Sequence, residues 1–175
     1  MDMIIRLGVE KDIAKLEELY NELNDYLEAH VNYPGWKKGV YPIRDDAIAG
    51  IKDGSLYVST ISGKIVGSII LSHKPEHAYL KTNWQKELKY SDVFVIYTFA
   101  IHPDYWGQGV GKELLKFAQK QANKKNIKGL RLDVYEKNLP AIKLYEKLGF
   151  KYIDTVDLGL ENYGLKWFRL YEKLL

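Results

Sequence analysis

The sequence predicts a mixed α/β protein in which helices pack against one β-sheet. Three observations lead to this fold class. Segments with apolar residues at helical spacing alternate with short apolar segments typical of strands, and turn residues separate most of them. The 175 residues contain no low-complexity tract, internal repeat or linker rich in Pro, Gly or Ser. We therefore expect one domain over residues 1–175, long enough to bury a substantial core.

The first part of the chain is expected to contain two helices and three strands. One helix is predicted over residues 12–29, where apolar side chains recur at helical spacing: Ile13, Leu16, Leu19, Tyr20, Leu23 and Leu27. Turn residues at 32–36 end that pattern. A second helix is expected over 44–52. Strands are expected over 3–7, 56–60 and 64–71, the last two paired as a hairpin around Ser62-Gly63.

The second part alternates strands and helices after an irregular stretch at 72–91. A long apolar strand is predicted over 92–101, and His102-Pro103-Asp104 stops it. Residues 109–126 carry one apolar face, which predicts a helix, and Gly149 is the expected end of a later one. The remaining expectations are a strand over 130–135, a helix over 138–148, and a final hairpin of strands over 150–158 and 164–173.

Composition and charge exclude several classes of protein. The net charge of +3, from 26 basic and 23 acidic residues, is too small to indicate binding to nucleic acid or a membrane surface. The absence of cysteine excludes disulfides, thiolate metal ligands and a cysteine nucleophile. The first residues lack the pattern of a signal peptide, and no run of about 18 apolar residues could span a bilayer. We therefore expect a cytoplasmic protein.

The strongest functional signal is a glycine-rich turn between the strand at 92–101 and the helix after it. Gly107, Gly109 and Gly111 alternate there, and successive backbone N–H groups at a helix N-terminus can bind phosphate. The spacing does not fit an ATP-binding P-loop, because Glu113 stands where a metal-binding hydroxyl is needed. It does not fit the dinucleotide fingerprint, because neither register supplies the third glycine. A turn needed only for tight packing of strand on helix is the alternative.

Two segments together resemble the GNAT superfamily of N-acetyltransferases. Ala100 to Gly111, with Leu114-Leu115, is similar to the family's pyrophosphate-binding segment, and Asn138 to Phe150 resembles its second hallmark. Trp106 departs from the pattern, since the family's loop usually begins with Gln or Arg, so a side-chain contact to phosphate is less secure than the backbone cradle. The resemblance implies a mixed, mostly antiparallel sheet of six or seven strands, flanked by helices and with splayed central strands.

The resemblance implies that acetyl-CoA is the acyl donor and that no metal is used. The pantetheine arm is expected along the backbone of 99–101, and the pyrophosphate on the N–H groups of 107–112. The acceptor amine would attack directly, through a tetrahedral intermediate whose oxyanion a backbone N–H near Phe99 or Ala100 stabilises. The residues expected to bind the cofactor are Phe99, Ala100, Ile101, Trp106, Gly107, Gln108, Gly109, Val110, Gly111, Lys112, Asn138 and Tyr145.

Tyr145 and Tyr97 are the expected catalytic residues. By the resemblance, Tyr145 is the general acid near the departing sulfur, and packing on the apolar face of its helix is the alternative. The general base stays open, because Tyr97 and its neighbour stand where many relatives carry a Glu. Water could relay the proton from Tyr97 or from a carboxylate such as Glu28 or Glu87.

Aromatic residues of the irregular regions are expected to border the acceptor site. The rings that cluster there belong to Tyr33, Trp36, Tyr41, Trp84 and Tyr90, and they suit an apolar or cationic amine. Tyr33, Trp36 and Trp84, together with Tyr97, are the candidate substrate-binding residues. Packing of the two irregular regions against each other is the alternative. An amine of a small molecule and an amine of a protein both remain open as acceptors.

His102 and Asn138 are expected to have structural roles. His102 belongs to the turn that ends its strand, and Asn138 caps its helix. No metal site is expected at His73 and His77, because Pro75 breaks the helix that would align them.

The rival functions are a non-catalytic module that binds acyl-CoA and an interaction protein with a degenerate cofactor site. A homodimer through the apolar C-terminal hairpin is a further hypothesis.

Overall fold

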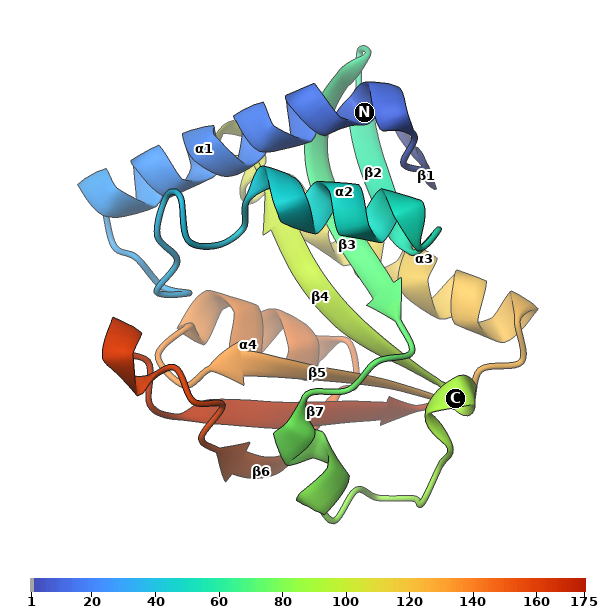
Figure 1. Ribbon diagram of the computed structural model, residues 1–175. Helices are drawn as coiled ribbons and strands as arrows, with labels where there is room; N and C mark the ends of the chain where they lie inside the picture. Colours follow the sequence, from blue (N-terminus) through green and yellow to red (C-terminus); the bar gives the residue numbers. More distant parts are fainter. Residues whose placement is uncertain (1) are drawn as a thin grey trace. The chain divides into compact units, whose positions relative to one another are not determined.

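The computed structural model describes residues 2–175, which contain seven strands and four α-helices (Figure 1). In chain order they are β1 (Met3–Leu7), α1 (Ile13–Ala29), α2 (Arg44–Lys52), β2 (Leu56–Ile61), β3 (Lys64–Ser72), β4 (Val93–Ile101), α3 (Val110–Lys124), β5 (Gly129–Tyr135), α4 (Leu139–Lys147), β6 (Lys151–Val156) and β7 (Phe168–Leu174). Every predicted helix and strand is therefore confirmed in type and order. No helix within residues 2–175 is long and apolar enough to cross a membrane.

The strands form a mixed sheet in the order β1-β2-β3-β4-β5-β7-β6. The pairs β1–β2, β2–β3, β5–β7 and β6–β7 are antiparallel, whereas β4 and β5 are parallel. The parallel ladder joins three residue pairs and ends at Val95 and Arg131, although β4 continues to Ile101 and β5 to Tyr135. The predicted mixed, mostly antiparallel sheet is confirmed.

The chain forms two compact units that interleave along the sequence. One comprises the described residues up to Asn32 together with Trp36–Leu71 and Tyr97–Ala118, and the other comprises Tyr33–Gly35, Ser72–Ile96 and Gln119–Leu175. Each unit is described separately below.

The core of the first unit is built on the apolar face of α1. Leu16, Tyr20, Leu23 and Leu27 recur every three or four residues, so they lie on one face of the helix, and all four are buried. Each such side chain contributes about 1.5–3 kcal/mol through burial. The β2–β3 hairpin turns at Ser62-Gly63, where both residues have positive φ, as a two-residue hairpin turn requires.

The second unit is organised around a buried ion pair between neighbouring strands. Arg131 of β5 donates from Nε to Oε2 of Glu172 on β7 at 2.7 Å, and both side chains are fully buried. The other nitrogens of Arg131 reach the Tyr90 hydroxyl at 3.0 Å and the Lys86 carbonyl at 2.9 Å, while the Gln85 N–H donates to Glu172 Oε1. The pair thereby fastens the irregular segment 85–90 to the sheet.

Two regions differ from the boundaries that the sequence predicts. Residues 72–91, expected to be irregular, contain the short 3-10 helix η2 (His77–Lys81) and the start of a second, η3 (Tyr90–Asp92). The last strand begins at Phe168 rather than at Gly164, because a 3-10 turn over Glu161–Tyr163 is followed by Gly164 in the left-handed conformation.

The ion pair gives a prediction for stability. Arg131→Met should lower the free energy of unfolding by about 3–5 kcal/mol, because it leaves the Glu172 carboxylate buried without its cation. The double variant Arg131→Met, Glu172→Leu should recover most of that loss, since it removes both charges. Urea unfolding of the three proteins measures both differences. Equal losses in the single and double variants would show that the cost comes from the lost packing and hydrogen bonds of Arg131 and not from the unpaired charge of Glu172.

Candidate active site

β4 changes its backbone conformation at Thr98. This residue has φ +48°, in the left-handed region, whereas Phe99 and Ile101 continue the strand. On the β3 side the end of the strand is occupied, since the His102 N–H donates to the Val66 carbonyl at 2.8 Å. The Ala100 carbonyl lies so close to Gly67 that a Cβ there would approach it to 3.1 Å. Residues 99–101, which are expected to bind the acyl donor, are therefore held closely against β3.

The turn after β4 is fastened through His102. The Asp104 N–H donates to its Nδ1 at 3.2 Å, so Nε2 carries the proton and donates to Glu22 Oε2 of α1 at 2.6 Å. The imidazole is almost fully buried, and both of its nitrogens are engaged. This supports the structural role that the sequence assigned to His102.

The glycine-rich turn offers open space beside its backbone. Gly107 and Gly109 have φ of +74° and +84°, and a Cβ at either position would meet no atom within 4 Å. α3 begins at Val110, whose buried side chain anchors the helix start. The first N–H groups of a helix have no intrahelical acceptor. The turn therefore suits a pyrophosphate, because it has room for an anion beside the N–H groups of a helix N-terminus.

Two side chains brace this turn from within the chain. The Trp106 indole N–H donates to the Ile101 carbonyl at 2.9 Å, and its ring packs edge-on against Tyr26 of α1. The Gln108 side chain donates to the Asp104 carbonyl at 2.9 Å. Trp106 stands where the family's loop usually has a polar residue, and its contacts brace the loop from within the chain.

Asn138 and Tyr145 lie on the second unit, at the start and in the last turn of α4. The Asn138 side chain accepts from the Ala141 N–H at 3.4 Å, so the predicted helix cap is present. Tyr145 is buried, and its ring packs against Phe150 at 5.8 Å and Tyr171 at 6.4 Å between centroids. Its ring therefore has the packing role that the sequence allowed as the alternative, and this role fixes the direction of its hydroxyl.

Sequence analysis missed a carboxyl group on β5. Asp133 is half-buried, and Oδ2 accepts from the Tyr79 hydroxyl at 2.6 Å. Burial raises the pKa of Asp133 to about 6; the hydrogen bond from Tyr79 opposes that shift, and the nearby Glu76 charge adds to it. One signal was available: Asp133 stands between Leu132 and Val134 in a strand, where only one face is expected to be polar.

The predicted substrate-binding aromatics fall into both units. Trp36 and Tyr97 belong to the first, where Trp36 packs edge-on against Tyr41 at 5.4 Å. Trp84 belongs to the second, together with the more exposed Tyr33. The Arg131 guanidinium lies 4.3 Å from the centre of the Trp84 ring, and the indole N–H donates to the Tyr79 carbonyl. The cation that Trp84 contacts is therefore one of the protein's own side chains.

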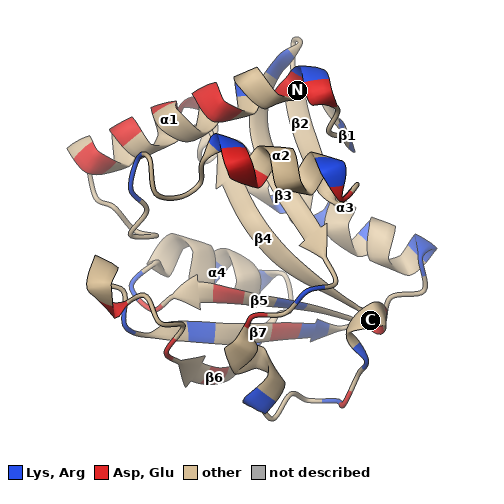
Figure 2. Ribbon diagram, in the orientation of Figure 1, with Lys and Arg blue, Asp and Glu red and all other residues tan. Residues whose placement is uncertain are grey.

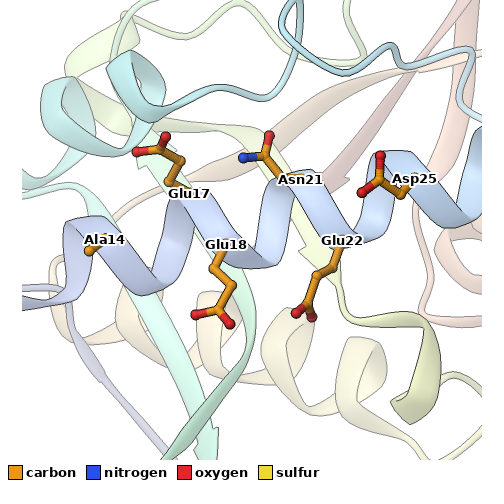
Figure 3. Close-up of a pocket in the computed structure, with 6 residues that line it drawn as sticks. All are labelled: Ala14, Glu17, Glu18, Asn21, Glu22 and Asp25. Carbon is orange, nitrogen blue, oxygen red and sulfur yellow. The ribbon is translucent and has the colours of Figure 1, made fainter.

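An acidic surface runs along the outer side of α1, where Figure 2 shows a row of acidic residues. Figure 3 shows the shallow pocket on this face, lined by Ala14, Glu17, Glu18, Asn21, Glu22 and Asp25. Three of the carboxylates already have cationic or imidazole partners: Arg44 for Glu17, Lys38 for Asp25, and His102 for Glu22. Within residues 2–175, no group of three or more His, Asp or Glu side chains is arranged to hold a metal ion.

Comparison with known proteins identifies the family. The profile described as "Acetyltransferase (GNAT) family" matches residues 16–150. Streptothricin acetyltransferase from Escherichia coli is 27% identical over 142 residues, which cover 78% of this chain and 72% of that protein. The [ribosomal protein bS18]-alanine N-acetyltransferase of Escherichia coli is 39% identical over 59 residues, or 34% of this chain and 40% of that protein.

The fold agrees with that family over the whole chain. A solved acetyltransferase from Salmonella typhimurium, with its cofactor acetyl-CoA, superimposes with a TM-score of 0.72 at 19% identity. The match covers 100% of this chain and 95% of that one. The family match covers the glycine-rich turn and the segment from Asn138 to Phe150. The chain therefore belongs to the acetyltransferase (GNAT) family and is an N-acetyltransferase that takes its acetyl group from acetyl-CoA.

Proposed function

We propose that the chain binds acetyl-CoA through the backbone of β4 and the turn before α3. The N–H groups of 107–112 hold the pyrophosphate, and the backbone of Phe99, Ala100 and Ile101 holds the pantetheine arm. The observation that carries this proposal is the open space beside Gly107 and Gly109, whose left-handed φ angles turn the backbone toward the helix N-terminus. Lys112, exposed in the first turn of α3, adds a positive charge there.

The same residues set up the chemistry. Acetyl-CoA supplies a thioester, and the acceptor amine attacks its carbonyl carbon without a protein nucleophile. A backbone N–H at Phe99 or Ala100 donates to the carbonyl oxygen as negative charge develops on it. Tyr145 donates its phenolic proton, or a hydrogen bond, toward the sulfur that leaves. Asn138 caps α4 and so fixes the helix that carries Tyr145.

We propose Asp133 as the group that takes the proton from the amine. A general base works best when its pKa lies near the working pH, and burial raises the pKa of Asp133 to about 6. The Tyr79 hydroxyl fixes one carboxylate oxygen at 2.6 Å, so the group has a defined orientation. A carboxylate is better suited to accept the proton than the phenol of Tyr97, which is a weak base. Tyr97 then belongs to the acceptor site and can relay the proton through water.

The acceptor is an amine of a small molecule or of a protein. The names of two relatives, a streptothricin acetyltransferase and a ribosomal protein alanine N-acetyltransferase, cover both classes. Trp36, Tyr33 and Tyr97 are the proposed aromatic contacts, whereas packing of Trp84 on Arg131 favours a structural role for that ring.

We further propose that residues 1–175 act as one domain in the cytoplasm, without nucleic acid or membrane, and that the C-terminal hairpin can form a homodimer. A carboxyl suited to be the base removes the support for a non-catalytic acyl-CoA-binding module.

Gly109→Val should abolish binding of acetyl-CoA, because a β-branched residue strains the left-handed conformation and its side chain enters the space for the phosphates. Calorimetric titration should show acetyl-CoA binding to the wild-type protein but not to the variant, with ATP and NAD as negative controls. Gly54→Val is the matched control, since Gly54 has φ +68° and equally open space outside the turn. Unchanged affinity in Gly109→Val, or no binding to the wild type, would refute the proposed donor site.

Tyr145→Phe should keep the ring packing against Phe150 and Tyr171 but remove the hydroxyl. We expect kcat to fall on the order of 100-fold, the usual contribution of general acid catalysis, with little change in affinity for acetyl-CoA. Release of free thiol measures kcat, and calorimetry measures binding. Equal rates in the two proteins would leave Tyr145 with a packing role only.

Asp133→Asn should abolish most activity while the amide oxygen still accepts from Tyr79. In the wild type, kcat/KM should fall below about pH 6, because the pKa of Asp133 is about 6 and its protonated form is inactive as a base. Tyr79→Phe should move that midpoint to higher pH, since the hydrogen bond lowers the pKa of Asp133. Glu76→Gln should move the midpoint to lower pH, since the Glu76 charge raises that pKa. Shifts in the same direction, or none, would remove Asp133 from the mechanism.

A further inference from the structure

Thr98 adopts a conformation that its side chain disfavours. A β-branched residue at φ +48° is a true outlier, and such left-handed residues are strained unless their surroundings hold them. Thr98 is buried within β4, directly before Phe99 and Ala100. The direction of these next two peptide units therefore depends on whatever fixes Thr98.

A single hydroxyl from a distant loop fixes Thr98 on two sides. The Tyr41 hydroxyl accepts from the Thr98 N–H at 3.1 Å and lies 2.8 Å from Thr98 Oγ1. The Thr98 carbonyl accepts from Ser68 Oγ at 3.1 Å, and Tyr20 donates to the same Ser68 oxygen at 3.0 Å. Each polar group of Thr98 is therefore bonded, although the residue has left the regular strand conformation. Tyr41 supplies two of these bonds.

Tyr41 is itself held in place by neighbouring residues of its own loop and of α1. Asn24 of α1 donates from Nδ2 to the Tyr41 carbonyl at 3.0 Å, and the Tyr41 N–H donates to the Lys37 carbonyl at 3.0 Å. The Trp36 ring packs edge-on against the Tyr41 ring. The loop that carries a proposed acceptor contact thus reaches the proposed donor strand through one hydroxyl. Backbone hydrogen bonds and ring packing thus fix the position of Tyr41, as a precise positioning role requires.

We infer that Tyr41 is a positioning residue for acetyl transfer: its hydroxyl holds Thr98 in the left-handed conformation and so aims the backbone of Phe99 and Ala100 at the acyl donor. The inference rests on the proposed donor site, because it assigns Tyr41 no contact with acetyl-CoA or with the amine. A backbone N–H that polarises a carbonyl must be placed within a few tenths of an ångström, and relaxation of Thr98 would move it.

The test compares Tyr41→Phe with the double variant Tyr41→Phe, Thr98→Gly. Phenylalanine keeps the ring but frees the Thr98 amide, so hydrogen exchange of that amide should accelerate in the protein without ligand. In turnover, kcat should fall at least about ten-fold with KM for acetyl-CoA within about two-fold, since a misplaced catalytic group costs up to about 100-fold in rate. Glycine accepts positive φ without strain, so the double variant should recover kcat to within about three-fold of the wild type.

Tyr20→Phe is the matched control. It removes one buried hydroxyl from the same network but leaves both bonds between Tyr41 and Thr98 in place. Urea unfolding should show a similar drop in midpoint for this variant and for Tyr41→Phe, whereas the kcat of Tyr20→Phe should stay within about two-fold of the wild type. A loss of kcat in Tyr20→Phe as large as that in Tyr41→Phe would show that activity follows stability, which overturns the inference.

Two further outcomes would overturn the positioning role of Tyr41 without affecting the proposed donor site. One is a wild-type kcat in Tyr41→Phe, and the other is no recovery of kcat when Thr98→Gly is added. If Tyr41→Phe does not fold, the double variant decides alone: folding with near wild-type kcat supports the inference, and folding without activity contradicts it. Failure of the wild type to transfer acetyl groups would instead refute the proposed function. The exchange rate of the Thr98 amide would still report whether Tyr41 holds that residue.

Discussion

Hydrogen bonding between the parallel strands β4 and β5 ends at Val95 and Arg131, before either strand does, and the proposed donor site depends on that early end. Backbone N–H and C=O groups are obligatory hydrogen-bonding groups, so a strand that loses its neighbour can offer them to an extended ligand. Beyond the ladder, β4 carries the left-handed Thr98 and then the segment proposed to receive the pantetheine arm. On β5, Asp133 is the second residue after the last pair. The end of the ladder thus separates the paired part of each strand from the part that carries the proposed site residues.

Buried polar side chains add to the backbone pairing that holds these strands. Arg131 and Glu172 tie β5 to β7 and fasten the segment 85–90. Tyr41 and Ser68 satisfy Thr98. Such networks are stabilising only when every member has a partner, and both of these meet that condition at the residues named. In the proposed account they position the site.

Local signals in the sequence were sufficient to predict the framework. Apolar spacing located α1 and α3, Ser62-Gly63 marked a hairpin, and Asn138 marked a helix cap, because each depends on residues a few positions apart. The glycine turn was predictable for the same reason, and the structure adds the left-handed φ angles of Gly107 and Gly109. The structural role of His102 also followed from its place beside Pro103.

Contacts between distant residues could not be predicted from the sequence. Tyr41 and Thr98 are 57 residues apart, and Tyr79 and Asp133 are 54 apart. The pKa of Asp133 depends on burial by segments that no local pattern places next to it. The aromatic rings of the irregular regions show that distant contacts also change the role of a residue. Their composition suggested an acceptor site, whereas Trp84 packs on Arg131 of β5, which follows β4 and α3 in the chain.

Backbone hydrogen exchange of the wild-type protein with and without coenzyme A tests the central claim most directly. If the backbone of β4 and the turn before α3 hold the donor, the N–H groups of 107–112 and of Phe99–Ile101 should exchange more slowly when coenzyme A is added. The Gln85 N–H, bonded to Glu172, should exchange at the same rate in both samples. Protection confined to other segments, or unchanged exchange at 107–112 under saturating coenzyme A, would contradict the account.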